Sequence, residues 1–107
     1  MALPTLTPEA RAAALKKAAE ARVRRSDIRR RLKNRETTLG AVIGEFEASG
    51  GEDTVLARTR VIDLLKSVPG LGPVRAAEAM DAAGIAPNRR LGGLGEHQRA
   101  ELVSRFS

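Results

Sequence analysis

The chain has 107 residues, which is enough for one modest hydrophobic core but not for two. It has no cysteine, tryptophan or tyrosine and only two phenylalanines, which excludes disulfides and thiolate metal sites and leaves no aromatic platforms for stacking bases. No apolar run approaches the roughly 18 residues of a membrane span, and the amino terminus lacks the layout of a signal peptide, so we expect a cytoplasmic protein with no membrane partner.

Positive charge is concentrated near the amino terminus. The chain carries 19 Lys and Arg against 13 Asp and Glu, a formal net charge of +6. Residues 11–35 hold eleven of the basic residues and only two acids, Glu20 and Asp27, so this stretch alone has a net charge of +9. Such a block is typical of a protein that binds a polyanion, because each neutralised phosphate releases counterions. The alternative interpretation is a solvated helix surface.

A long basic helix is predicted from Pro8 to about residue 35. Thr7 and Pro8 are a typical helix start, with a capping hydroxyl followed by a proline at the first helical position. Two apolar stripes on nearly opposite sides of this helix consist of Ala12, Leu15, Ala19 and Val23, and of Ile28 and Leu32. They predict either a kink or break near residues 24–27, or an amino-terminal half that packs weakly and orders on its partner. The basic side chains that face away from the second stripe, free to reach phosphates, are Arg11, Arg22, Arg29 and Lys33.

Two further helical segments are predicted before residue 68. Thr37 or Thr38 caps the first, whose apolar residues have ideal amphipathic spacing and are Leu39, Val42, Ile43 and Phe46. The second is expected to run from about residue 52 to 67, after the stop at residues 49–51. No segment alternates as a strand would, so the predicted class is all-α, with a basic helical arm over residues 1–35 and a compact helical domain over residues 36–107.

The most informative stretch runs from Val68 to Ala76, where an apolar helix leads into Pro-Gly-Leu-Gly and another helix starts at once. Gly70 and Gly72 are expected to allow a tight turn and to bring bare backbone close to a ligand. Pro73 favours the first turn of the next helix, whose unpaired amides form an anion site. This pattern resembles the helix–hairpin–helix motif, which implies contact with DNA phosphates without reading of sequence. The alternative is an ordinary helix–helix turn.

The helix after the hairpin is predicted to run from Pro73 to Ala83, with Gly84 as its left-handed stop. Its expected core positions are Val74, Ala77 and Met80. Two glycine-rich turns follow from residue 85 to 95, and a last helix is expected from about Glu96 to Phe106. This order of elements resembles the helix–two-turns–helix module of DNA repair enzymes and of a small-subunit ribosomal protein.

Over essentially its whole length the chain resembles the actinobacterial integration host factor family. The resemblance is carried by the opening Met1–Pro4, the Ala/Arg-rich helix, the hairpin and the run from residue 85 to 95. It implies a nucleoid-associated protein that binds duplex DNA through the phosphate backbone with little sequence specificity and affects DNA shape and compaction. The family shares only a name with the two-subunit β-ribbon protein that kinks DNA through the minor groove.

The resemblance implies that phosphates contact the hairpin and the pair Arg89 and Arg90. The family pattern often has Lys where Pro73 stands and a third basic residue where Gly92 stands, so we expect weaker hairpin binding and more reliance on Arg75, on the arginine pair and on the arm. The full set of expected DNA-binding residues is Val68, Pro69, Gly70, Leu71, Gly72, Pro73, Val74, Arg75, Arg89, Arg90, Gly93, Gly95, Arg22, Arg29 and Lys33.

Catalysis is one alternative, because helix–hairpin–helix motifs also occur in DNA glycosylases and lyases. Lysine-dependent enzymes of that kind place the nucleophile where this chain has Val74, and Gly92 stands about where their catalytic Asp would fall. Bifunctional glycosylases with the two-turn module rely instead on an amino-terminal Pro or Glu, whereas this chain begins Met-Ala-Leu-Pro. His97 is the only histidine, so no histidine pair can hold a metal. We expect no enzyme activity, no cofactor and no small-molecule substrate.

RNA or ribosome binding is a second alternative, since the ribosomal relative of the module binds RNA and backbone contacts do not separate DNA from RNA. A scaffold that offers its basic helix to an acidic protein has no supporting motif. We expect double-stranded DNA as the partner, a location in the nucleoid and, because no coiled-coil seam is present, a monomer.

Overall fold

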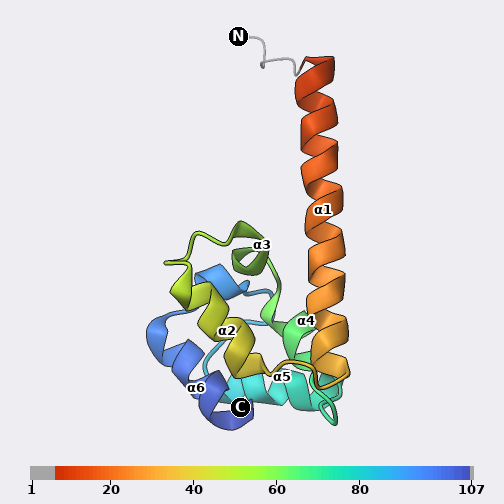
Figure 1. The fold of residues 1–107 in the computed structure, drawn as a ribbon. Helices are drawn as coiled ribbons and strands as arrows, with labels where there is room; N and C mark the ends of the chain where they lie inside the picture. The colour runs from red at the N-terminus through yellow and green to blue at the C-terminus, as the bar shows by residue number, and fades with distance from the viewer. Residues whose placement is uncertain (1–6, 107) are drawn as a thin grey trace.

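The computed structural model describes residues 7–106, whose regular structure is helical apart from one isolated β-bridge (Figure 1). The elements are α1 (Pro8–Lys33), α2 (Leu39–Ala48), α3 (Thr54–Ala57), α4 (Val61–Lys66), α5 (Pro73–Ala82), the 3-10 turn η1 (Leu91–Gly93) and α6 (Glu96–Phe106). The predicted all-α class is confirmed. The opening Met1–Pro4 lies outside the described residues. No helix within residues 7–106 is long and apolar enough to cross a membrane.

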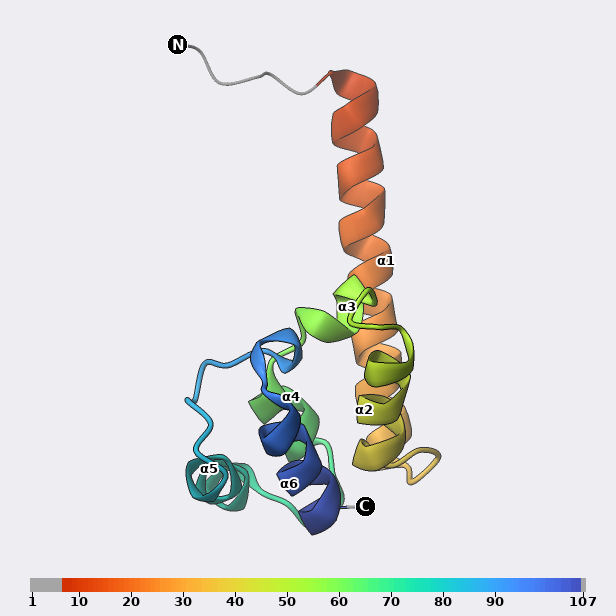
Figure 2. The ribbon, with the colours of Figure 1, turned by 90° about the vertical axis from the view of Figure 1, so that its left-hand side faces the viewer.

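α1 is one unbroken helix of 26 residues, and its first half stands clear of the other helices (Figure 1 and Figure 2). The predicted kink near residues 24–27 is therefore wrong. Leu15 and Val23 are 65% and 70% exposed, so the first apolar stripe faces no core and nothing bends the helix to bury it. The other alternative, an amino-terminal half that packs weakly, agrees with this exposure.

Both ends of α1 have a local cause. Thr7 accepts a hydrogen bond from the amide of Ala10 at 3.0 Å, which is the predicted cap. The helix ends at Lys33, two residues earlier than predicted, because Arg35 takes a left-handed conformation with φ of 61°. The chain then turns directly into α2, which Thr38 caps by accepting from the amide of Ala41 at 3.1 Å.

A single core, aliphatic apart from Phe46, holds the last turns of α1 against the other helices. α1 contributes Ile28 and Leu32, and α2 buries the predicted set of Leu39, Val42, Ile43 and Phe46. α2 packs against α6, and α4 packs against α5. The carboxyl end of the arm is thus part of the domain core, whereas the amino-terminal half extends beyond it.

The stretch from residue 52 to 67 is two short helices rather than the single helix predicted. Asp53 caps α3 by accepting from the amide of Leu56 at 3.2 Å. Between α3 and α4 the chain leaves helical geometry, and an antiparallel bridge joins Arg60 to Arg90 of the two-turn loop. Backbone hydrogen bonds to a distant segment replace intrahelical ones here, and helix propensity cannot indicate that exchange.

α5 turns a different face to the core than the sequence predicts. Val74 and Ala77 are exposed, Val74 by 70%, and only Met80 of the predicted set is buried. Ala76 and Ala79 take the other core positions. Because the fully buried Ala76 lets α4 and α5 approach closely, it fixes the buried face, and Val74 lies about 200° away from it around the helix.

The remaining boundaries agree with the prediction to within a residue. α5 ends at Ala82, and Gly84 has the expected left-handed conformation with φ of 69°. α6 has the predicted bounds. Leu71 of the hairpin is half-buried against the core, as expected for a side chain that points inward.

Candidate nucleic-acid interface

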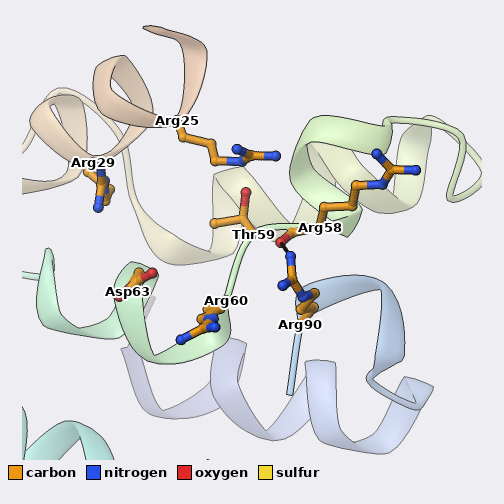
Figure 3. A pocket seen from close by; sticks show the side chains of 7 residues that line it. All are labelled: Arg25, Arg29, Arg58, Thr59, Arg60, Asp63 and Arg90. Carbon is orange, nitrogen blue, oxygen red and sulfur yellow. Dashed lines mark hydrogen bonds between the residues drawn. The ribbon is translucent and has the colours of Figure 1, made fainter. Parts of the chain in front are cut away.

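A small cavity of about 190 Å³ lies where α1, the α3–α4 junction and the two-turn loop meet (Figure 3). Its lining residues are Arg25, Arg29, Arg58, Thr59, Arg60, Asp63 and Arg90. Five arginines and one aspartate give this lining a net charge of +4. Guanidinium groups are planar donors that match the oxygen atoms of phosphate, so the cavity suits an oxyanion.

Backbone hydrogen bonds fix two of these arginines side by side. The amide of Val61 donates to the carbonyl of Arg89 at 3.1 Å, and the amide of Leu91 donates to the carbonyl of Thr59 at 2.9 Å. These bonds flank Arg60 and Arg90, which are therefore directly opposed as a non-hydrogen-bonded antiparallel pair. Such a pair has Cα atoms about 4.5 Å apart and side chains on one face of the backbone.

Arg90 and Arg25 differ in how their hydrogen-bonding groups are used. Nη1 of Arg90 donates to the carbonyl of Arg58 at 2.8 Å, which holds the Arg90 side chain at the cavity (Figure 3). Nε of Arg25 is buried and has no hydrogen-bond partner among the described residues. A buried donor without an acceptor costs free energy, so an acceptor oxygen in the cavity would stabilise this arrangement.

The basic surface continues from the cavity along α1 toward the hairpin. A second hollow, of about 490 Å³, shares Arg29 and Asp63 with the cavity and reaches Ser67, which adjoins the hairpin. We call the two hollows together the basic cleft, whose basic residues are Arg25, Arg29, Arg30, Lys33, Arg58, Arg60, Lys66 and Arg90. The cleft thus brings together predicted contacts from the arm and the two-turn loop, and it ends beside the hairpin.

Ion pairs divide the cations of α1 into two groups. Asp27 pairs with Arg30 and Arg31, and Asp53 pairs with Arg24. Among the described residues no ion pair involves the other seven cations of the same helix: Arg11, Lys16, Lys17, Arg22, Arg25, Arg29 and Lys33. No carboxylate in an ion pair compensates their positive charge, and the three predicted DNA contacts of α1, Arg22, Arg29 and Lys33, all belong to this group.

The Arg24–Asp53 pair ties the arm to the domain. Nη1 and Nη2 of Arg24 donate to the two carboxylate oxygens of Asp53 at 2.7 and 2.5 Å, a bidentate geometry that restricts orientation as well as distance. The Asp53 side chain is 16% exposed and also caps α3. The hydrogen bond from Arg24 lowers the pKa of the Asp53 carboxyl, and this effect exceeds the opposing effect of burial.

This pair should make stability depend on pH in acid. Because the folded-state pKa of Asp53 lies below its usual value of 3.8, its contribution is present above about pH 4 and is lost as the pH falls through the lowered pKa. Asp53→Asn keeps a capping side chain but removes the charge, and we expect it to lower the free energy of unfolding by about 1 kcal/mol at neutral pH.

Asp53→Ala is the companion variant, because it also removes the cap and should cost about 2 kcal/mol. Urea unfolding of the wild type and both variants between about pH 7 and 2 measures these differences. The Asp53→Asn difference should shrink in acid, while the loss of the cap in Asp53→Ala should persist in part. A difference that stayed constant over this pH range would contradict the role of the ion pair.

The hairpin turn depends on one of its two glycines. Gly70 has a φ of 80°, in the left-handed region that favours glycine. Gly72 has a φ of −81° as the cap of α5, and a Cβ placed there would meet no atom within 4 Å. The expected tight-turn role is confirmed for Gly70 and is wrong for Gly72. The space at Gly72 is open enough for a phosphate to approach this backbone, and that approach stays a prediction.

Alanine at these glycines should therefore have unequal effects on stability. Gly70→Ala forces an L-residue into left-handed geometry and should lower the free energy of unfolding by about 1–2 kcal/mol. Gly72→Ala loses a favoured cap but also restricts the unfolded chain, so its net effect should stay within about 0.5 kcal/mol. Urea denaturation compares the two, and equal losses would contradict the assigned turn.

The exposed residues of the hairpin form its outer surface. They are Pro69, Gly70, Gly72, Pro73, Val74 and Arg75. Val68 and Leu71 are half-buried and face the core rather than solvent. Arg75 lies on the first turn of α5 and lines neither hollow of the basic cleft, so the structure does not bring it together with Arg90.

The two-turn loop places its arginines and glycines differently. Arg90 enters the cleft, whereas the Arg89 side chain crosses Gly93, where a Cβ would lie 2.8 Å from Cδ of Arg89. A Cβ at Gly92 would lie 3.0 Å from the carbonyl oxygen of Ala57. A side chain at Gly92 would therefore require Ala57, the last residue of α3, to move by a few tenths of an ångström.

Sequence reasoning did not single out five basic residues of the cleft: Arg25, Arg30, Arg58, Arg60 and Lys66. Arg25 was indistinguishable from other cations of the charged block. Arg58 and Arg60 lie in the stretch predicted as one helix. The β-branched residues on either side of Arg60, Thr59 and Val61, were the only local signal for extended backbone there.

Comparisons with known proteins agree with this architecture. Residues 32–106 match the family model of the S13-like H2TH domain. The chain is 47% identical over 106 residues to integration host factor of Streptomyces coelicolor, across 99% of this chain and 95% of that protein. Integration host factor of Mycobacterium tuberculosis is also 47% identical, across 99% of this chain and 97% of that protein.

A solved structure shares the fold as well as the sequence pattern. The structure of sIHF bound to an 8bp palindromic DNA matches with a TM-score of 0.76 and 40% identity, covering 86% of this chain and 99% of that one. The helix–two-turns–helix module predicted from the hairpin and the two glycine-rich turns is thus confirmed. The chain therefore belongs to the same integration host factor family as these relatives, and it carries the S13-like helix–two-turns–helix domain.

Proposed function

We propose that this protein is a nucleoid-associated architectural protein that binds duplex DNA through the phosphate backbone with little sequence specificity. The observation that carries the proposal is the basic cleft, where arginines from three separate elements converge. Apart from Arg30, none of these arginines forms an ion pair within residues 7–106. The relatives support it, because they are named integration host factors and a similar protein is bound to a palindromic DNA.

In this proposal the DNA backbone lies along the basic cleft and continues along the arm. Arg25, Arg29 and Arg90 contact phosphates at the cleft, and the amides of the first turn of α5 contact another phosphate at the hairpin. The 26 residues of α1 span roughly 39 Å, somewhat more than the ~34 Å of one DNA turn. Contacts to phosphates are independent of base identity, so all sequences are bound alike and the protein acts on DNA shape and compaction.

In this proposal the protein catalyses no reaction. Binding needs only charge and backbone amides, so it requires neither a cofactor nor a small-molecule substrate, and one chain suffices to form the cleft. We therefore propose a non-catalytic monomer that resides with DNA in the nucleoid.

The test is binding of the purified protein to several unrelated DNA duplexes and one RNA duplex of equal length, across a salt series. We expect similar affinity for all the DNA duplexes, weaker binding to RNA and a slope of log affinity against log salt of about −0.9 for each phosphate contacted. Equal or tighter binding to RNA would instead favour an RNA- or ribosome-binding function. Strong preference for one DNA sequence would contradict backbone recognition.

A further inference from the structure

The juxtaposition of Arg60 and Arg90 is unfavourable for the protein alone. The two residues are directly opposed across the antiparallel bridge, so their side chains leave the same face of the backbone. Like charges in that position destabilise a pair of extended segments. Neither arginine joins an ion pair among the described residues, and Asp63, which lines the same cavity, does not pair with them.

The cavity also offers more donors than the protein has acceptors for. The buried Nε of Arg25 has no hydrogen-bond partner among residues 7–106. Arg90 is already oriented by its bond to the carbonyl of Arg58. Figure 3 shows the Arg25, Arg60 and Arg90 side chains coming from three different elements around Thr59. A ligand that carries negative charge and several acceptor oxygens would satisfy the free donors and remove the repulsion.

We propose that the cavity is a phosphate seat, a discrete site that holds one phosphate group among Arg25, Arg60 and Arg90. Phosphate oxygens accept hydrogen bonds from Nε of Arg25 and from the guanidinium groups of the opposed pair. The inference rests on the proposed function where DNA supplies that phosphate. A free oligophosphate is the second source of such a group, because its terminal phosphate accepts hydrogen bonds from the same donors and carries a higher charge.

The test measures thermal unfolding of the full chain with and without inorganic tripolyphosphate, at an ionic strength held constant with sodium chloride. The variants are Arg60→Gln and Arg90→Gln. Arg105→Gln is the matched control, because Arg105 pairs with Glu101 on α6 and lines neither hollow of the cleft.

Without the anion, Arg60→Gln should unfold roughly 2–5 °C above the wild type, because the substitution removes the like-charge pair. Tripolyphosphate should raise the unfolding temperature of the wild type and of Arg105→Gln by several degrees. It should raise that of Arg60→Gln and Arg90→Gln by less than half as much.

Duplex DNA binding by the same variants distinguishes the two sources of phosphate. A loss of about fourfold in DNA affinity for Arg60→Gln at 0.2 M salt, with no such loss for Arg105→Gln, places a backbone phosphate in the seat. Loss of the tripolyphosphate response with unchanged DNA affinity makes the seat one for free oligophosphates. Equal tripolyphosphate responses together with equal DNA affinities in all proteins would overturn the seat, and DNA binding itself would then still support the proposed function.

Discussion

Replacing Arg29, Arg60 and Arg90 together with glutamine is expected to weaken binding to duplex DNA about one hundredfold at 0.2 M salt. If each arginine neutralises one phosphate, the slope of log affinity against log salt becomes less steep by about 2.7, and this difference accumulates between 1 M and 0.2 M salt. The three residues come from α1, the α3–α4 junction and the two-turn loop, so the effect tests whether the cleft acts as one site. Fluorescence anisotropy over a salt series measures both the affinity and the slope.

The matched control is the substitution of Arg31, Arg35 and Arg105 with glutamine, which removes the same net charge. Arg31 and Arg105 are ion-paired with Asp27 and Glu101, and none of the three residues lines the cleft. We expect this variant to lose less than about tenfold in affinity, because it lowers only the overall positive electrostatic potential of the protein. Equal losses for the two triple variants would show that total charge, rather than the cleft, determines binding.

Leu32→Ala should lower the free energy of unfolding by about 3 kcal/mol. Leu32 is 2% exposed in the core, and truncation of a buried leucine loses its transfer free energy and leaves a cavity. Leu15→Ala makes the same chemical change in the same helix at a site that is largely exposed, and it should alter stability by less than about 0.5 kcal/mol. Urea unfolding at neutral pH compares the two variants.

The Leu32 variant also has a consequence for binding. Leu32 and Ile28 attach the carboxyl end of α1 to the core, so weakening that attachment should loosen Arg25 and Arg29 relative to Arg90. We expect Leu32→Ala to bind DNA more weakly than Leu15→Ala at temperatures where both are folded. If Leu15→Ala were the more destabilised of the two, the assigned docking of the arm would be wrong.

Helices whose limits depend on neighbouring residues were predictable from the sequence. The cap at Thr38, the proline that starts α5 and the left-handed Gly84 act within a few residues, and the structure confirms all three. The break between α3 and α4 was not predictable, because its cause is hydrogen bonding to a loop about thirty residues further along the chain. Tertiary contacts of this kind override local propensity, and the two β-branched neighbours of Arg60 were too weak a local signal to predict the break.

The candidate site, too, could be predicted only in part from the sequence. The sequence indicates a basic arm and an arginine pair, but it does not indicate which cations are compensated. Arg24 and Arg25 are adjacent in the chain, and a helix separates their side chains by about 100°. Arg24 therefore reaches Asp53, while Arg25 lines the cleft with an unsatisfied Nε. Only the position of Asp53 in space, which the fold determines, separates their roles.

Because α1 is unbroken, the arm leaves the domain in one fixed direction. A continuous α-helix resists bending because each turn is closed by its own hydrogen bonds, and this one is clamped at a set angle by Arg24 and Asp53. Bending a short stretch of DNA, in contrast, costs only a few kcal/mol, which phosphate contacts can offset. If a straight duplex cannot contact the cleft and the arm together, we therefore expect the DNA rather than the protein to change shape, so that α1 sets the path of the duplex.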